Sequence, residues 1–154
     1  MRSRRITTFL LPLFGAALWF NAASAAELTV TVDNLRNGEG DVRLSAYTSA
    51  DEWPEHPLPE HDQVEPTNKE GVVFHFDLPP GTYAVATFHD ENSNGEFAQN
   101  FLGIPEEGYG FSNNLRPMLT APSFEAASFV LPPTGAALTI HMIYWLPAPR
   151  RKTP

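Results

Sequence analysis

The chain has 154 residues, no cysteine, and 18 acidic against 10 basic side chains, which gives a formal net charge of −8 at pH 7. This acidic balance argues against a nucleic-acid or anionic-membrane partner, because both require a basic protein surface. Without disulfides the fold must be held by an apolar core, and the chain is long enough to form one.

The first 25 residues have the three parts of an export signal. A basic start with Arg2, Arg4 and Arg5 precedes an apolar run over residues 6–20, and Ala23-Ser24-Ala25 then supplies a small-residue cleavage site. A transmembrane anchor is the alternative, but the run is shorter than the roughly 20 residues that span a bilayer. We therefore expect cleavage after Ala25, a periplasmic or secreted protein, and no transmembrane segment after cleavage.

Apolar and polar residues alternate along most of the remaining chain, as in half-buried strands. The pattern predicts strands over residues 28–33, 42–47, 72–78, 82–89, 124–131 and 137–145. The first two are expected to form a hairpin or meander. A proline-rich acidic connection over residues 51–70, where regular structure is not expected, and a long loop over residues 90–122 separate the others.

These strands predict one all-β domain over residues 26–146, followed by a flexible basic tail over residues 147–154. No stretch has apolar residues at helical spacing over three turns. The expected architecture is an antiparallel two-sheet sandwich of six or seven strands.

The long loop begins with a motif that resembles the first half of a calcium loop, D-x-N-x-N-G. Side-chain oxygens of Asp90, Asn92, Asn94 and Glu96 could surround a hard cation. The acid expected at the twelfth position is missing, because Phe101 stands there. The alternative is an Asx-rich turn, in which these side chains accept hydrogen bonds from the local backbone.

Further along the loop, aromatic residues alternate with glycine and asparagine, which is unusual for a simple connection. Loops on rigid sandwiches commonly carry function, so these side chains are candidates for ligand binding. The candidate ligand-binding residues are Asn100, Tyr109, Phe111, Asn113 and Asn114. The alternative is that the aromatic rings fold inward as a private hydrophobic cluster of the loop.

Catalytic signals are weak. The histidines could form a transition-metal site only if the fold assembled them, because no H-x-H or H-E-x-x-H spacing occurs. They are His56, His61, His75, His89 and His141. There is no cysteine nucleophile and no G-x-S-x-G motif, so the sequence assigns no catalytic residue and favours a non-enzymatic protein.

Several motifs occur in consistent order along the chain: residues 78–86 and 89–95, then 100–105, 109–114 and 122–125. In these motifs the chain resembles domain-of-unknown-function family 2141, a group of exported bacterial proteins. The Pro80-Gly81-Thr82-Tyr83 strand start also resembles transthyretin-like (prealbumin-like) and carboxypeptidase-regulatory sandwiches, which implies the same fold class. The family resemblance implies no activity and no catalytic residues.

The sequence thus predicts a non-enzymatic binding or accessory module that acts through residues 90–114, with calcium as a possible structural ion. Its partner would be an envelope protein, a peptide or a glycan. The alternatives are an envelope-associated hydrolase and a structural subunit of an envelope complex.

Overall fold

The computed structural model describes residues 25–117 and 119–147. The predicted export signal, apart from Ala25, and the predicted tail, apart from Pro147, lie outside the described residues. The described elements are β1 (Ala26–Asp33), β2 (Asp41–Tyr47), η1 (Pro59–His61), β3 (Asp62–Pro66), β4 (Val72–Leu78), β5 (Gly81–Asp90), β6 (Gly108–Phe111), η2 (Ser112–Asn114), α1 (Phe124–Ala127), β7 (Phe129–Leu131) and β8 (Ala136–His141).

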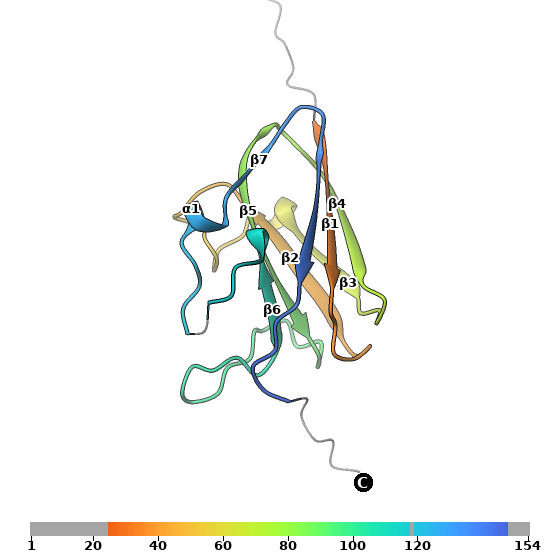
Figure 1. Ribbon diagram of the computed structural model, residues 1–154, viewed down its shortest axis with the longest axis vertical. Coiled ribbons are helices and arrows are strands. Elements are labelled where there is room, and N and C mark those ends of the chain that lie inside the picture. The colour runs from red at the N-terminus through yellow and green to blue at the C-terminus, as the bar shows by residue number, and fades with distance from the viewer. Residues whose placement is uncertain (1–24, 118, 148–154) are drawn as a thin grey trace, which may run out of the picture.

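The strands form two sheets that face each other as a sandwich (Figure 1). The smaller sheet has the strand order β4-β1-β8, and the larger has the order β3-β2-β5-β6, with β7 paired to the start of β5. The antiparallel sandwich predicted from the alternation is confirmed in its fold class. One pair departs from it, because β1 and β8 run parallel, from Leu28 beside Ala136 to Asp33 beside His141.

The core lies between the sheets and follows the alternation of the sequence. In β1 the side chains of Leu28, Val30 and Val32 are fully buried, and in β4 every second residue from Val72 to Leu78 is buried. From the opposite sheet, β2 contributes Val42, Leu44 and Ala46, which are also fully buried. Burying apolar side chains at about 25 cal/mol per Å² is the main stabilising contribution in a domain without disulfides.

Three local predictions are corrected. The expected pairing of the first two strands is wrong, because β1 pairs with β4 and β8 whereas β2 lies in the other sheet. Residues 51–70 contain regular structure, since β3 adds an edge strand beside β2. The predicted strand over residues 124–131 begins as the short helix α1, because the Ser123 side chain caps it by accepting the Ala126 N–H.

A fourth difference concerns the loop predicted over residues 90–122. It contains β6, which pairs with β5 from Gly108 beside His89 to Phe111 beside Ala86. With β3 and β6 added to the six predicted segments, the described residues contain eight strands. No helix in the described ranges is long and apolar enough to span a bilayer.

Gly110 allows β6 to pass close to β8. A Cβ atom at this position would lie 2.5 Å from Ile140 Cγ2 and 3.3 Å from Thr87 Cγ2. We expect Gly110→Ala to destabilise the protein by about 1–3 kcal/mol, because both neighbours are packed. The measurement is the urea midpoint of unfolding. Gly38→Ala is the matched control, since its Cβ would meet only Lys69 Cγ at 3.6 Å, and an equal loss in both variants would contradict this account.

Candidate functional site

Three consecutive polar side chains, His89 and Asp90 at the end of β5 and Glu91 directly after it, hold the surrounding loops in place. The first, His89, is fully buried. Its Nε2 lies 2.7 Å from the Glu39 carbonyl oxygen and its Nδ1 lies 2.7 Å from the Tyr144 hydroxyl. Because a carbonyl oxygen can only accept, Nε2 carries a proton and donates. His89 therefore ties the loop after β1 to the segment after β8.

Asp90 faces the opposite side of β5 and is also fully buried. It accepts hydrogen bonds from Arg43 Nε at 2.9 Å, from the Gly95 N–H at 2.7 Å and from the Asn94 N–H at 3.0 Å. Burial alone would raise the pKa of Asp90, but these donors outweigh it and the pKa is lowered. The carboxylate is thus ionised, and its hydrogen bonds connect the turn at residues 94–95 to Arg43 on β2.

Glu91 forms a bidentate ion pair with Arg36, in which Arg36 Nε lies 2.8 Å from Oε1 and a terminal nitrogen bonds Oε2. Burial opposes ionisation here too, but hydrogen bonds from Arg36 and Asn37 lower the pKa of Glu91. The Arg36 guanidinium lies over the Tyr144 ring, 4.5 Å from its centroid, and donates to the Leu146 carbonyl at 2.7 Å. This pair joins three segments that are far apart in the sequence.

The predicted calcium ligands form a series of Asx turns. Asn92 Oδ1 accepts the Asn94 N–H, Asn94 Oδ1 accepts the Glu96 N–H, each at 2.9 Å, and Asp90 binds Arg43. The described residues contain no group of three or more His, Asp or Glu side chains placed to hold a metal. In this geometry the side-chain oxygens of Asp90, Asn92 and Asn94 accept hydrogen bonds from backbone amides, as in the Asx-rich turn, whereas the Glu96 side chain is exposed and takes no part in these bonds.

The chain then forms a projecting hairpin over residues 98–106, which we call the 98–106 hairpin. Gln99 pairs with Pro105, and the Glu106 N–H donates to the Ala98 carbonyl at 3.0 Å. At the tip, Asn100 Oδ1 accepts the Leu102 and Ile104 N–H groups at 2.9 and 3.1 Å. The hairpin is therefore held by its own hydrogen bonds rather than left as an irregular loop.

Glu107 anchors the base of this hairpin. Its carboxylate accepts the Ala98 N–H at 3.1 Å, whereas its Oε1 atom is buried without a hydrogen-bond partner. Burial raises the pKa of Glu107, and the negative charges of Asp90 and Glu91 raise it further. The fold therefore makes ionisation of this side chain less favourable than it is in water.

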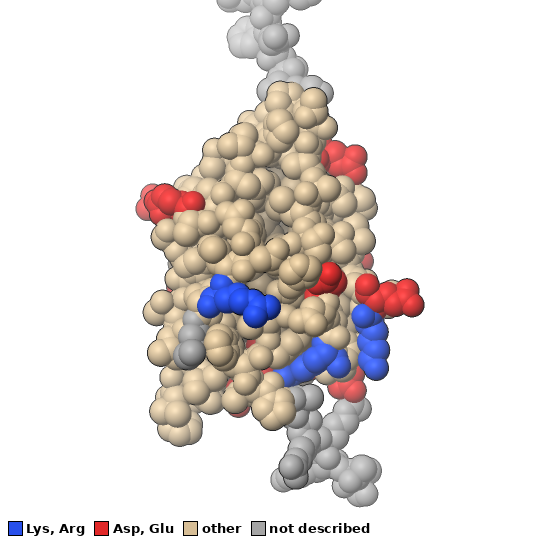
Figure 2. All heavy atoms as spheres, in the orientation of Figure 1, with Lys and Arg blue, Asp and Glu red and all other residues tan. Residues whose placement is uncertain are grey.

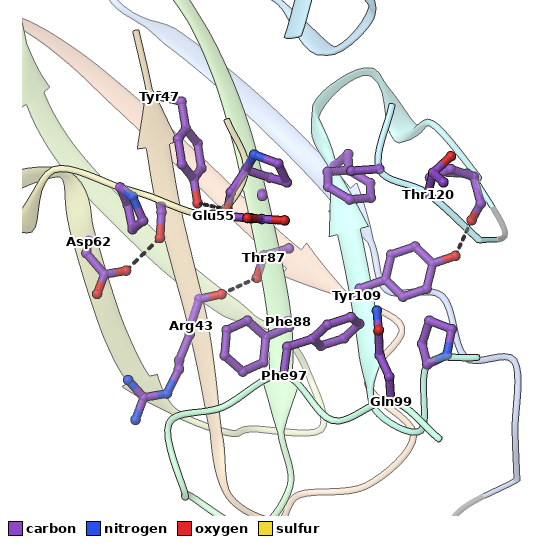
Figure 3. Close-up of a pocket in the computed structure, with 18 of the residues that line it drawn as sticks. Arg43, Tyr47, Glu55, Asp62, Thr87, Phe88, Phe97, Gln99, Tyr109 and Thr120 are labelled. Atoms are coloured by element: carbon purple, nitrogen blue, oxygen red, sulfur yellow. Dashed lines mark hydrogen bonds between the residues drawn. The ribbon is translucent and has the colours of Figure 1, made fainter. Parts of the chain in front are cut away.

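A groove of about 720 Å³, here called the outer groove, lies over the outward face of the larger sheet (Figure 3). Its floor comes from β2, β5 and β6, and its walls come from residues 54–62, the 98–106 hairpin, Pro117 and residues 119–121. The residues that line it include Arg43, Glu55, Asp62, Phe88, Phe97, Gln99, Tyr109 and Thr120. Ligand sites commonly have volumes of roughly 300–1,000 Å³, so the groove is large enough to hold a small ligand.

Aromatic rings pack edge-on across the floor of the groove. Ring centroids lie 5.7 Å apart for Phe88 and Phe97, 6.1 Å for Phe97 and Tyr109, and 5.7 Å for Tyr109 and Phe111. Tyr109 and Phe111 are buried, whereas Phe97 is 37% exposed. The exposed ring is thus supported from beneath by rings that do not move freely.

The structure separates the predicted ligand-binding residues into two sets. Tyr109 and Phe111 line the outer groove, although both are largely covered. Asn100 holds the hairpin tip, and Asn113 donates to the Ala126 and Ser128 carbonyls. Asn114 donates to the Thr139 carbonyl at 2.9 Å and accepts a backbone N–H from β8. The three asparagines thus make structural hydrogen bonds and do not line the groove.

Several residues that line the groove were not predicted as site residues, among them Arg43, Phe88 and Gln99. Phe88 could have been found from the strand over residues 82–89, which is apolar on both faces and so must present a ring outside the core. Arg43 and Gln99 carry no such signal. Their place in the groove depends on pairings across the sheet and within the hairpin.

The fold does not gather the histidines. His89 is buried at the end of β5, whereas His141 pairs with Asp33 at 2.5 Å on the exposed face of the smaller sheet. His75 lies on that face too and contacts Glu27 at 3.1 Å. Neither His56 nor His61 is among the residues that line the groove. The hypothesis of a histidine-based metal cluster gains no support from the described residues.

Comparison with known proteins identifies the family and nothing beyond it. Residues 30–139 match the family described as "Uncharacterized protein conserved in bacteria (DUF2141)", and the chain belongs to this family. No curated protein and no solved structure matches the chain significantly.

We expect calcium to leave the thermal stability unchanged, because Asp90, Asn92 and Asn94 already bond to backbone amides and Arg43. The measurement is the melting temperature with and without about 5 mM calcium, at which a millimolar site would be occupied. Asp90→Ala serves as the comparison. A rise in melting temperature in the wild type that is lost in Asp90→Ala would restore the calcium site.

Glu107→Gln should stabilise the protein at pH 7 by about 1 kcal/mol, because the fold disfavours the ionised carboxylate. The folded-state pKa is raised, so the contribution of Glu107 to stability is complete below its unfolded pKa of about 4.3 and is lost as pH rises through the folded value. The gain should therefore vanish below about pH 4 in urea titrations. Glu106→Gln, at the exposed neighbour, should show no such gain, and equal behaviour of the two variants would refute the argument.

Proposed function

We propose that this member of the family is an exported, non-enzymatic binding protein whose ligand lies in the outer groove. The observation that carries the proposal is the groove itself, an aromatic floor on a regular sheet bounded by ordered loops. Concave sites lined by aromatic rings with a few polar groups are the usual form of small-ligand sites.

Export is supported by residues 1–25, whose basic, apolar and small-residue parts match a cleavable signal. The acidic composition of the rest of the chain agrees with a soluble domain that does not bind nucleic acid. Figure 2 agrees with this, because the face it shows has few charged side chains and no continuous patch of lysine and arginine. The proposed location is the periplasm or the medium.

Binding is favoured over hydrolysis by the side chains available in the groove. No histidine or cysteine lines it among the described residues. The serine that does, Ser45, donates its hydroxyl hydrogen to Asp62 at 2.6 Å, and within the described residues it has no hydrogen bond to a histidine that could act as general base. The groove thus has a binding surface and lacks an activated nucleophile.

The walls of the groove are fixed before any ligand arrives. Asp90 holds the turn that leads to Phe97, and Glu107 holds the base of the 98–106 hairpin. Ordering a loop on binding costs affinity, and a preformed wall avoids that cost. A rigid groove is the arrangement expected of a recognition module.

A second candidate role is docking to an envelope protein through the tip of the 98–106 hairpin. Phe101 is 95% exposed and Leu102 is 63% exposed there, although the turn that carries them is well hydrogen-bonded. Exposed apolar side chains on a rigid turn are typical of contact surfaces. The tip is not part of the groove, so the two roles can be separated by mutation.

Filling the groove tests the proposal. Ala86 lies on the floor, and Ala86→Phe should block a ligand without entering the core. The measurement is the change in backbone amide NMR shifts when labelled protein is mixed with pools of peptides, oligosaccharides and amphiphiles. We expect shifts at Phe88, Gln99 and Tyr109 that disappear in Ala86→Phe.

The matched control is Val73→Phe, which adds a ring to the exposed face of the smaller sheet, where Val73 is 47% exposed. This variant should bind as the wild type does. Binding that persists in Ala86→Phe, or no binding from any pool, would contradict the proposed function.

A further inference from the structure

The centre of the outer groove is lined by aromatic side chains. Phe88 and Phe97 lie side by side over the sheet in Figure 3, with Gln99 beside Tyr109 next to them. The edge-on packing of Phe97 between Phe88 and Tyr109 braces the exposed ring. A ligand that uses this surface must therefore have an apolar face of its own.

The strands beneath the groove have no free backbone groups to offer. β2 lies between β3 and β5, and β5 lies between β2 and β6. The outer edge of β6 is closed by Ile143, which exchanges hydrogen bonds with Tyr109 at 3.0 and 2.8 Å. A peptide cannot add itself to this floor as a further strand, so recognition must come from side chains.

Polar groups that make no hydrogen bond within the described residues lie around the aromatic rings. Glu55, Gln99 and Thr120 line the groove, and their side chains make no hydrogen bond within the described residues. Arg43 binds Asp90 through Nε, and its two terminal nitrogens have no hydrogen-bond partner in the described chain. This rim supplies an acceptor, several donors and two groups that can do both.

Charge narrows the choice of ligand. Arg43 is already paired with Asp90, whereas the carboxylates of Glu55 and Asp62 also line the groove. The chain as a whole carries a formal charge of −8. An anionic ligand would meet like charges at close range, so the groove suits a neutral one.

We propose that the ligand is a neutral glycan. A pyranose ring has an apolar face of C–H groups and an edge of hydroxyl groups that both donate and accept hydrogen bonds. The C–H face would pack on the exposed ring of Phe97, and the hydroxyl groups would bond to Gln99, Glu55 and Arg43. This inference rests on the proposed function, because it names the ligand class of the same groove.

The test is calorimetric titration of the purified protein with neutral hexasaccharides of β-1,4-glucose, α-1,4-glucose, N-acetylglucosamine, mannose and xylose. At least one should bind with Kd below about 1 mM, and Phe97→Ala should weaken it at least about tenfold. Phe97→Tyr, which keeps the ring, should retain binding. Phe101→Ala is the matched control, since this phenylalanine lies on the same hairpin outside the groove and its loss should change nothing.

Gln99→Ala should weaken binding about fivefold, the loss expected for one neutral hydrogen bond. An acidic hexagalacturonate should bind at least about tenfold more weakly than the best neutral sugar. Absence of binding by every neutral sugar, binding that survives Phe97→Ala, or preference for the acidic sugar would overturn the inference.

The failure of this inference can be told apart from failure of the proposed function. Neutral proline-rich peptides and octaethylene glycol monododecyl ether, an amphiphile without a sugar, are titrated in parallel. If either binds in a Phe97-dependent way and no oligosaccharide does, the glycan inference is overturned and the binding role of the groove stands. If no probe of any class depends on Phe97, both are overturned.

Discussion

The hydrogen bonds and ion pairs of His89, Asp90 and Glu91 are the constraint on which the rest of the structure depends. These residues lie at the end of β5 and directly after it. His89 bonds to the loop after β1 and to Tyr144 after β8, Asp90 bonds to the turn at residues 92–96, and Glu91 pairs with Arg36 in the loop after β1. Removing one partner of a buried charge pair leaves the other uncompensated, which costs several kcal/mol, so these contacts can have only one arrangement. A domain without disulfides gains from them a fixed end to its sandwich.

This constraint also explains why the outer groove has walls. The turn held by Asp90 brings Phe97 onto Phe88, and the Glu107 carboxylate bonds the start of the same hairpin. The segment from Asp90 to β6 therefore stabilises one end of the sandwich and also forms part of the proposed binding groove. In its calcium-like motif the side-chain oxygens of Asp90, Asn92 and Asn94 hold the turn by accepting hydrogen bonds from backbone amides.

Much of the fold could be predicted from the sequence, because alternation records which face of each strand is buried. Leu28, Val30 and Val32 lie in the core as the pattern indicated. What alternation does not record is which strands pair, so the expected hairpin of β1 with β2 was wrong. The same limit applies to the site. Arg36 and Glu91 are 55 positions apart, and no local pattern links them. Tyr109 and Phe111 were predicted because their segment is locally unusual, whereas Arg43 and Gln99 enter the groove only through tertiary pairing.

Amide hydrogen exchange in Asp90→Asn tests most directly the claim that Asp90 organises the wall of the groove. The amides of Asn94 and Gly95 bond to this carboxylate, whereas the Val85 amide is bonded within the core to Ser112. We predict that the exchange rate of Gly95 relative to that of Val85 rises at least about tenfold in the variant, because the turn opens locally while the sandwich stays folded. An equal change at Gly95 and Val85, or no change at either, would contradict the account.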